Sequence, residues 1–273
     1  MIIVGPLRKH AAVDDKGNVC LNPKQVEFYK RELNRRGPIF LSNKPPIESR
    51  NKYCESYIIV NNETLRELIA NNQPLNNLIT TLVTDMSNLF KEIRFGENEY
   101  WDITTWDVSN VTNMNNMFNG SLFDQEIGNW NVSKVVNMRS MFEYSIFNQS
   151  IENWNVGSVA TMRSMFRGSK FNQPIGNWDI GSLENTSRMF WSARFNQPIG
   201  LWKMNKVKNA DQMFAISEFN FSINEWNLDA IESMEFIFKD SAYNQSAENF
   251  IEKTKEILKT TDLEKIENYL GLS

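Results

Sequence analysis

The residues with the most reactive side chains are few in this chain and lie far from the rest of its patterned sequence. There is a single histidine, His10, and there are two cysteines, Cys20 and Cys54. A Ser-His-Asp or Cys-His catalytic site would need His10, and no nucleophile motif accompanies it. The histidine and the cysteines also lack the spacing of a zinc site. The sequence therefore predicts a protein that is not an enzyme, with no catalytic residues, no metal site and no cofactor.

Carboxylates and glycines recur beside turns, outside the patterns that exchange protons or bind phosphate. Asp102 and Asp107 are isolated carboxylates of this kind, which more often cap turns or face solvent than form acid–base pairs. Gly128, Gly176 and Gly200 share one repeat position, so they predict turns and not a phosphate-binding loop.

Basic residues are concentrated in the middle of the chain. Residues 130–210 contain ten Lys or Arg and four acids, a net charge of +6, whereas residues 211–273 contain five basic and thirteen acidic residues, a net charge of −8. The basic segment is interpreted either as a solvated face or as an electrostatic patch for an acidic protein surface. Nucleic acid is the less favoured partner, because the whole chain has a net charge of −4 and carries no known binding motif. A basic middle beside an acidic end also permits head-to-tail association.

The candidate interaction residues are the basic side chains of this segment and Trp191, one of several aromatics that depart from the repeat pattern; the others are Trp101, Tyr144 and Phe221. Arg139 and Arg163 share one repeat position, and Lys170 and Arg194 share another, so part of the positive charge is expected to form stripes. A tryptophan occupies a position that is acidic or basic in other units and could anchor a partner. The candidates are Arg139, Arg163, Arg167, Lys170, Arg188, Arg194 and Trp191.

Most of these candidate residues belong to a sequence repeat with a period of 24 residues. One tryptophan per period recurs at Trp106, Trp130, Trp154, Trp178, Trp202 and Trp226. A phenylalanine after methionine recurs at Phe118, Phe142, Phe166, Phe190 and Phe214. A fixed period of this length is typical of a solenoid, in which each unit buries its apolar face on its neighbours. These aromatic columns are therefore predicted to be the structural core of the repeats.

Each unit is predicted to contain a short strand, a turn with an inward tryptophan, and a short helix. A period-2 alternation indicates the strand, as at Phe171, Gln173 and Ile175. An apolar stripe indicates an α- or 3₁₀-helical segment, as at Val111, Met114, Met117 and Phe118. Columns of Gln and Asn are expected to form hydrogen-bonded ladders between successive units. The expected fold is an α/β solenoid with a parallel sheet and helical caps at both ends.

The chain divides into three segments on this pattern. Residues 1–77 form a non-repeat segment and cap, with helices predicted at 25–36 and 62–72 and a strand at 57–60. Residues 78–250 form a solenoid of about seven 24-residue repeats, the first with an insertion around residues 94–100. Residues 251–273 complete a C-terminal helical cap, with helices predicted at 247–259 and 262–270.

The repeat resembles a known family. The unit Phe-Asn-Gln-Pro-Ile-Gly-Asn-Trp-Asp-Ile, which begins at Phe171, is followed in the repeats by Val/Leu-x-x-Met-x-x-Met-Phe. This pattern resembles the BspA-like leucine-rich repeat of bacterial surface proteins, which also occurs in mycoplasma-type lipoproteins and in some giant-virus proteins. The resemblance covers roughly residues 80–250. It implies a leucine-rich-repeat-like, right-handed coil and a role in protein binding or adhesion, with no catalytic residues to carry over.

The expected function is a non-catalytic protein–protein interaction scaffold or a structural component of a large assembly, such as a minor capsid or cement protein of a large DNA virus. The partners would be proteins, among them capsid or other assembly subunits. No signal peptide, lipidation cysteine or run of about 18 apolar residues is evident, so an intracellular or virion location is expected. The alternative is a surface adhesin exported by an unrecognised route. The sequence leaves the oligomeric state open.

Overall fold

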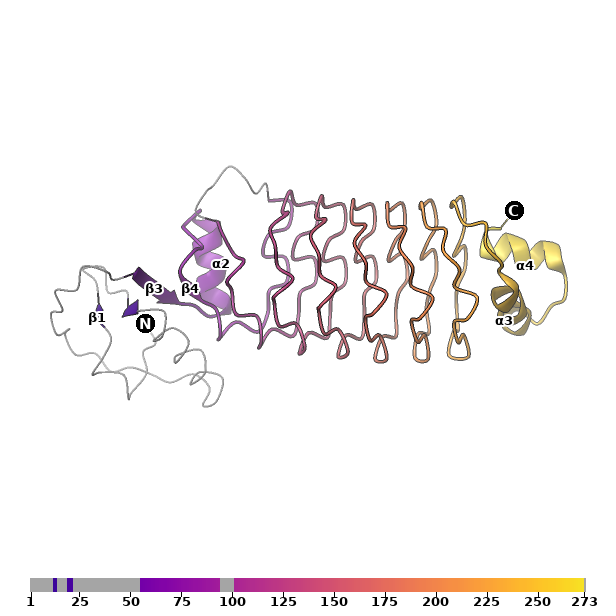
Figure 1. Cartoon of the computed structure of the whole chain (residues 1–273), viewed down its shortest axis with the longest axis horizontal. Helices are drawn as coiled ribbons and strands as arrows, with labels where there is room; N and C mark the ends of the chain where they lie inside the picture. The colour runs from indigo at the N-terminus through magenta and orange to yellow at the C-terminus, as the bar shows by residue number, and fades with distance from the viewer. Residues whose placement is uncertain (1–11, 14–18, 22–54, 94–100, 273) are drawn as a thin grey trace. The chain divides into compact units, whose positions relative to one another are not determined.

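The computed structural model describes residues 12–13, 19–21, 55–93 and 101–272 (Figure 1). The chain forms two compact units, which are described separately. The N-terminal unit comprises residues 1–84 and 99–110, and the coil unit comprises residues 85–98 and 111–273. His10, Cys54, the helix predicted at 25–36 and the insertion at 94–100 lie outside the described residues, and Cys20 is described only as a strand position.

The described part of the N-terminal unit contains a four-stranded sheet and one helix. Its strands are β1 (Ala12–Val13), β2 (Val19–Leu21), β3 (Glu55–Ile59) and β4 (Leu78–Ile79), in the order β1-β2-β3-β4. The first two pairings are antiparallel and the β3–β4 pairing is parallel. Helix α2 (Asn62–Ala70) begins with a capping box, in which the Asn61 side chain accepts from the Thr64 N–H and the Thr64 hydroxyl accepts from the Asn61 N–H.

Residues 101–110 are tied to the N-terminal unit by side-chain hydrogen bonds. The indole N–H groups of Trp101 and Trp106 donate to the carbonyls of Gln73 and Leu75, at 3.0 and 3.1 Å. The structure therefore groups residues 78–84 and 99–110 with the N-terminal unit, whereas the sequence assigns both segments to the repeats.

The coil unit consists of successive 24-residue coils that lie side by side (Figure 1). We name them A (111–134), B (135–158), C (159–182), D (183–206), E (207–230) and F (231–247), and count repeat positions from the first residue of each coil. Parallel bridges join position 3 of neighbouring coils, from Asn113–Asn137 to Asn209–Ser233. The N–H groups at positions 4, 6, 8 and 10 of coil A donate to the carbonyls at positions 3, 5, 7 and 9 of coil B, and later coils largely repeat this.

The predicted helix of each unit is not formed in coils A–F. The residues of the apolar stripe form consecutive turns. Within a coil, the Met117 N–H donates to the Met114 carbonyl, three residues back, whereas every second N–H group of the segment donates to the next coil. A left-handed residue at position 6, with φ of 55° at Asn116, interrupts any helix. The methionines and phenylalanines are still buried, so the prediction of a core stripe is confirmed and the prediction of a helix is wrong.

The strand predicted at Phe171, Gln173 and Ile175 is also absent, because neighbouring coils contact one another there through side chains. The Asn172 N–H donates to the side-chain oxygen of Asn148, 2.9 Å away. The same bond recurs along position 14, from Asp124 to Asn244. The Asn column is therefore a ladder as expected, although its amides bond to backbone N–H groups and not to one another.

The core of the coil unit consists of stacked aromatic columns. Phe142 and Phe166, at position 8, have ring centroids 5.8 Å apart and planes within 6°. Within coil C, Phe166 and Phe171 have centroids 4.2 Å apart. All the repeat tryptophans and phenylalanines predicted to be core are buried. The tryptophan N–H is also satisfied in coils B–E, where Trp178, for example, donates to the Ile151 carbonyl at 3.2 Å.

Two helices cover the end of coil F. They are α3 (Glu248–Leu258) and α4 (Leu263–Leu270), close to the predicted bounds (Figure 1). The carbonyls of Tyr269 and Leu270 accept from the N–H groups of Phe236 and Phe238. Gly271 ends α4 with φ of 73°, and a Cβ there would lie 2.6 Å from the Lys239 backbone, so only glycine fits.

Candidate protein-interaction groove

A groove of ≈ 460 Å³ crosses coils A–D on the face formed by positions 5, 6 and 9. Four arginines and a single acid line it, together with small polar side chains. We call it the arginine groove, and its residues are Asn115, Asn116, Arg139, Ser140, Glu143, Arg163, Ser164, Arg167 and Arg188. Its composition is that of a surface that attracts anionic groups.

The repeat itself fixes where these side chains emerge. At position 3 a side-chain oxygen accepts from the N–H at position 5: the Arg139 N–H, for example, donates to Asn137 Oδ1 at 3.0 Å. Position 6 then adopts a left-handed conformation, with φ of 53° at Ser140 and 57° at Ser164. Because both the turn and the coil-to-coil ladder repeat, equivalent side chains lie above one another in columns.

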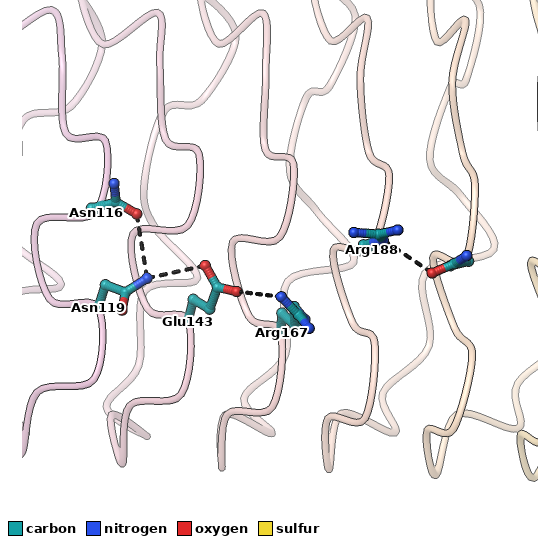
Figure 2. A network of polar contacts seen from close by, with 6 residues as sticks. Asn116, Asn119, Glu143, Arg167 and Arg188 are labelled. Atoms are coloured by element: carbon teal, nitrogen blue, oxygen red, sulfur yellow. Dashed lines mark hydrogen bonds and ion pairs between the residues drawn. The ribbon is translucent and has the colours of Figure 1, made fainter.

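Position 9 carries a chain of polar contacts that runs across three coils (Figure 2). The Asn119 amide donates to Glu143 Oε2 at 3.0 Å, and Arg167 Nη1 lies 3.0 Å from Glu143 Oε1. The Glu143 side chain is only 11% exposed and that of Arg167 28% exposed. The carboxylate is therefore satisfied by two neighbours, and it orients the guanidinium of the next coil.

Two aromatic rings flank the guanidinium of Arg167. Its central carbon lies 4.5 Å from the Trp191 ring centroid and 5.3 Å from the Tyr144 ring centroid, within the range of cation–π contacts. Tyr144 lies close over Gly168, where a Cβ would be 2.4 Å from the ring. The predicted anchor Trp191 thus contacts Arg167, and it is only partly exposed.

The other arginines of the groove are less constrained. Arg188 Nε donates to Gln212 Oε1 at 3.0 Å, which turns this side chain toward coil E (Figure 2). The guanidinium groups of Arg139 and Arg163 have no hydrogen bond or ion pair within the described part of the chain. Arg139 is exposed and Arg163 partly exposed. These two cations are available to an external anion.

The structure brings together five of the seven predicted interaction residues. Four arginines line the groove and Trp191 adjoins it, whereas Lys170 and Arg194 are exposed at position 12 and do not line it. Sequence analysis missed the groove residues without positive charge, Asn115, Asn116, Ser140, Glu143 and Ser164, whereas the flanking Tyr144 is one of its out-of-pattern aromatics. The 24-residue offset between Glu143 and Arg167 is the signal that could have identified their ion pair.

Two other properties bear on function. Among the described residues, no group of three or more His, Cys, Asp or Glu side chains is placed to hold a metal ion. No helix in the described ranges has both the length and the apolar character needed to cross a membrane.

Comparison with known protein families gives a match that covers the repeats. The family described as "Mycoplasma protein of unknown function, DUF285" matches residues 59–169, 84–194, 122–218 and 145–250. The chain belongs to the DUF285 family. The overlapping matches in successive registers also identify this DUF285 member as a repeat protein of mycoplasma type. Neither curated proteins nor solved structures gave a match.

Proposed function

We propose that this DUF285 protein is a non-catalytic interaction scaffold whose arginine groove binds an acidic surface of a protein partner. In this proposal the coils form a leucine-rich-repeat-like, right-handed solenoid of the BspA type. The repeats supply a rigid column of binding positions, and the groove supplies their chemistry.

The proposal rests mainly on one observation: the groove contains one arginine whose guanidinium is fixed by neighbouring side chains and two whose guanidinium groups have no partner within the described residues. Arg167 is oriented by Glu143 and by two rings, at 3.0 Å from the carboxylate and 4.5 Å from the Trp191 centroid. Arg139 and Arg163 have no partner within the described residues, and they carry +2 that the groove's single acid does not neutralise. Guanidinium groups bind carboxylates in bidentate geometry, which suits Asp and Glu side chains of a partner.

The rigidity of the groove favours binding further. Backbone bonds between coils fix the spacing of the arginine-bearing turns, so little backbone order has to be gained on association. The charges also increase the rate of encounter with an acidic partner, and this effect falls with ionic strength.

A role as a structural component of a large assembly, of the minor-capsid or cement kind, is the second candidate. It is favoured by large apolar side chains on the outside of coils D and E. Leu201 is 83% exposed at a position that is Asn in coils A–C, and Phe221 is 38% exposed in the Gln column. Exposed apolar side chains of this kind suit permanent contacts. The surface-adhesin role is the remaining alternative.

The test compares Arg139→Glu/Arg163→Glu with the matched control Lys203→Glu/Lys206→Glu, which changes the same charge at exposed lysines outside the groove. Binding of a poly-glutamate peptide is measured by fluorescence anisotropy, and partners are recovered by native purification with mass spectrometry. We expect the groove variant to lose about tenfold or more in affinity while the control stays near wild type. Equal losses in both variants, or no loss in the groove variant, would refute the proposal.

A further inference from the structure

The charge at position 5 changes sign along the stack. One residue per coil occupies this column, and the residues of coils B–F are Arg139, Arg163, Ser187, Asp211 and Glu235. The order is therefore basic, basic, neutral, acidic, acidic. The column is antisymmetric about Ser187, because residues at equal distances on either side of it have opposite charge.

We propose that this face binds a second copy of the chain in antiparallel orientation, with a two-fold axis across coil D. Arg139 of each copy then faces Glu235 of the other, and Arg163 faces Asp211. The inference rests on the proposed function of the arginine groove, and it names the acidic partner as the C-terminal coils of a second molecule.

The geometry follows from the symmetry of face-to-face packing. A two-fold axis that lies in the interface, perpendicular to the stack, reverses the order of the coils and preserves the repeat position. Coil B therefore faces coil F, coil C faces coil E, and coil D faces itself. Each of the two opposite-charge pairs occurs twice, so the column forms four pairs.

The side chains concerned are accessible and not neutralised within one molecule. Arg139 and Glu235 are both exposed, and neither has a side-chain ion pair or hydrogen bond in the described ranges. The Asp211 carboxylate accepts from the Ser233 hydroxyl and the Glu235 N–H at one oxygen and from the Asn209 amide at the other, and these neutral donors leave its charge in place. Complementary charges of this kind set register and orientation between partners.

A second column changes sign along the stack, between coils D and E, so that Lys170 would face Glu218 and Arg194 would face its own copy. At position 12, Lys170 and Arg194 of coils C and D are followed by Glu218 of coil E, and all three are exposed. A parallel, head-to-tail arrangement would also pair unlike charges, but only after a shift of three coils, which leaves most of the column unopposed. The antiparallel arrangement uses all five coils from B to F.

Two basic residues of the central coil, Arg188 and the exposed Arg194, oppose self-association, because each faces its own copy across the axis. Arg188 lines the groove in coil D, so the two copies of Arg188 lie near the axis and repel each other. Arg188→Gln, which copies the residue at the same position in coil E, should therefore strengthen self-association while weakening binding to a foreign acidic protein. This opposite sign separates the inference from the proposed function.

The first experiment is sedimentation of the full chain at about 0.05 M and about 0.5 M salt, because screening weakens exposed charge pairs. We expect a dimer that dissociates at high salt. Arg139→Glu and Glu235→Arg should each weaken it about tenfold or more, since each reversal acts twice. The double variant Arg139→Glu/Glu235→Arg restores opposite charges and should dimerise, and Lys203→Glu is the control. Circular dichroism confirms that each variant is folded.

The second experiment tests the axis. In a chain with Cys20 and Cys54 replaced by Ser, the exposed coil-D residue Ser192 is changed to Cys and treated with a short bis-maleimide. The two-fold arrangement predicts closed covalent dimers. A monomer at every concentration, reversals without effect, a folded double variant that stays dissociated, or absence of the cross-link would each overturn the inference. Poly-glutamate binding that persists in such a monomer would leave the proposed function standing.

Discussion

Gly168→Ala tests how the arginine groove is held, because Gly168 lies beneath the Tyr144 ring that flanks Arg167. Gly168 has φ of 63°, and an added Cβ would lie 2.4 Å from Tyr144 Cδ1 and 2.5 Å from Cε1. The ring must therefore move. Gly120 provides a matched control, because it has the same repeat position and φ of 65°, yet the atom nearest to its Cβ would be Glu92 Cγ at 3.3 Å, which is not part of a ring.

The expected magnitudes follow from these two environments. A non-glycine residue in the left-handed region costs roughly 1–2 kcal/mol, and both variants bear this cost. In Gly168→Ala the half-exposed Tyr144 ring also swings away from Arg167, which removes a cation–π contact that contributes about 0.5–1 kcal/mol. We therefore expect destabilisation of about 2–3 kcal/mol for Gly168→Ala and about 1–2 kcal/mol for Gly120→Ala.

The assay is urea unfolding followed by tryptophan fluorescence, with the midpoints compared at unchanged slope. Both glycine variants are also made in a Tyr144→Ala background. There the cost of Gly168→Ala should fall to that of Gly120→Ala, since no ring remains to displace. Equal costs in the wild-type background, or a cost for Gly168→Ala that does not respond to Tyr144→Ala, would show that the ring does not pack on this glycine.

Three further predictions concern the coils and their C-terminal helix. Trp178→Phe removes the 3.2 Å indole bond to the Ile151 carbonyl, which keeps its bond from the Trp154 N–H, so unfolding should become easier by about 0.5–1.5 kcal/mol in urea titrations. Ile216→Gly removes a β-branched, half-exposed residue from φ of 60° and should raise the free energy of unfolding by up to about 1 kcal/mol, seen as a higher urea midpoint. The pKa of Asp262 is lowered, chiefly by the Lys265 backbone N–H that it caps. The stability that the ionised Asp262 side chain gives to α4 is therefore complete above the ordinary Asp pKa and is lost as the pH falls through the lowered pKa. Amide hydrogen exchange of α4, measured between about pH 5 and about pH 2, should become faster as this stability is lost.

The sequence predicted the period and the core because both depend on side-chain type alone. The tryptophan position of Trp154 and the phenylalanine position of Phe166 recur every 24 residues. A position that holds a large aromatic side chain in every coil is expected to be buried, and both are. The C-terminal helices were equally accessible, since Asp262 and Gly271 are a typical N-cap and C-cap.

The conformation of the turn segment could not be predicted in the same way. Its stripe of methionines fits a helical period, but the backbone N–H groups have an alternative partner in the next coil. Ser140 and Ser164 adopt left-handed φ values without being glycine, so no local signal marks the break. The pairing of Glu143 with Arg167 likewise depends on the stacking of coils, because the two residues are far apart in sequence.

The direction of the backbone ladder has a consequence for how the coil stack ends. The N–H groups at positions 4, 6, 8 and 10 donate to the next coil, so at the C-terminal end of the stack such N–H groups need carbonyl acceptors from outside the repeats. The carbonyls of Tyr269 and Leu270 satisfy Phe236 and Phe238 at this end, where a further coil would otherwise bind. Helix α4 therefore caps the stack and occupies the N–H groups on which a further coil would form. Without it the stack would expose a templating edge on which another molecule could continue the ladder, and the protein would become the seed of a fibre.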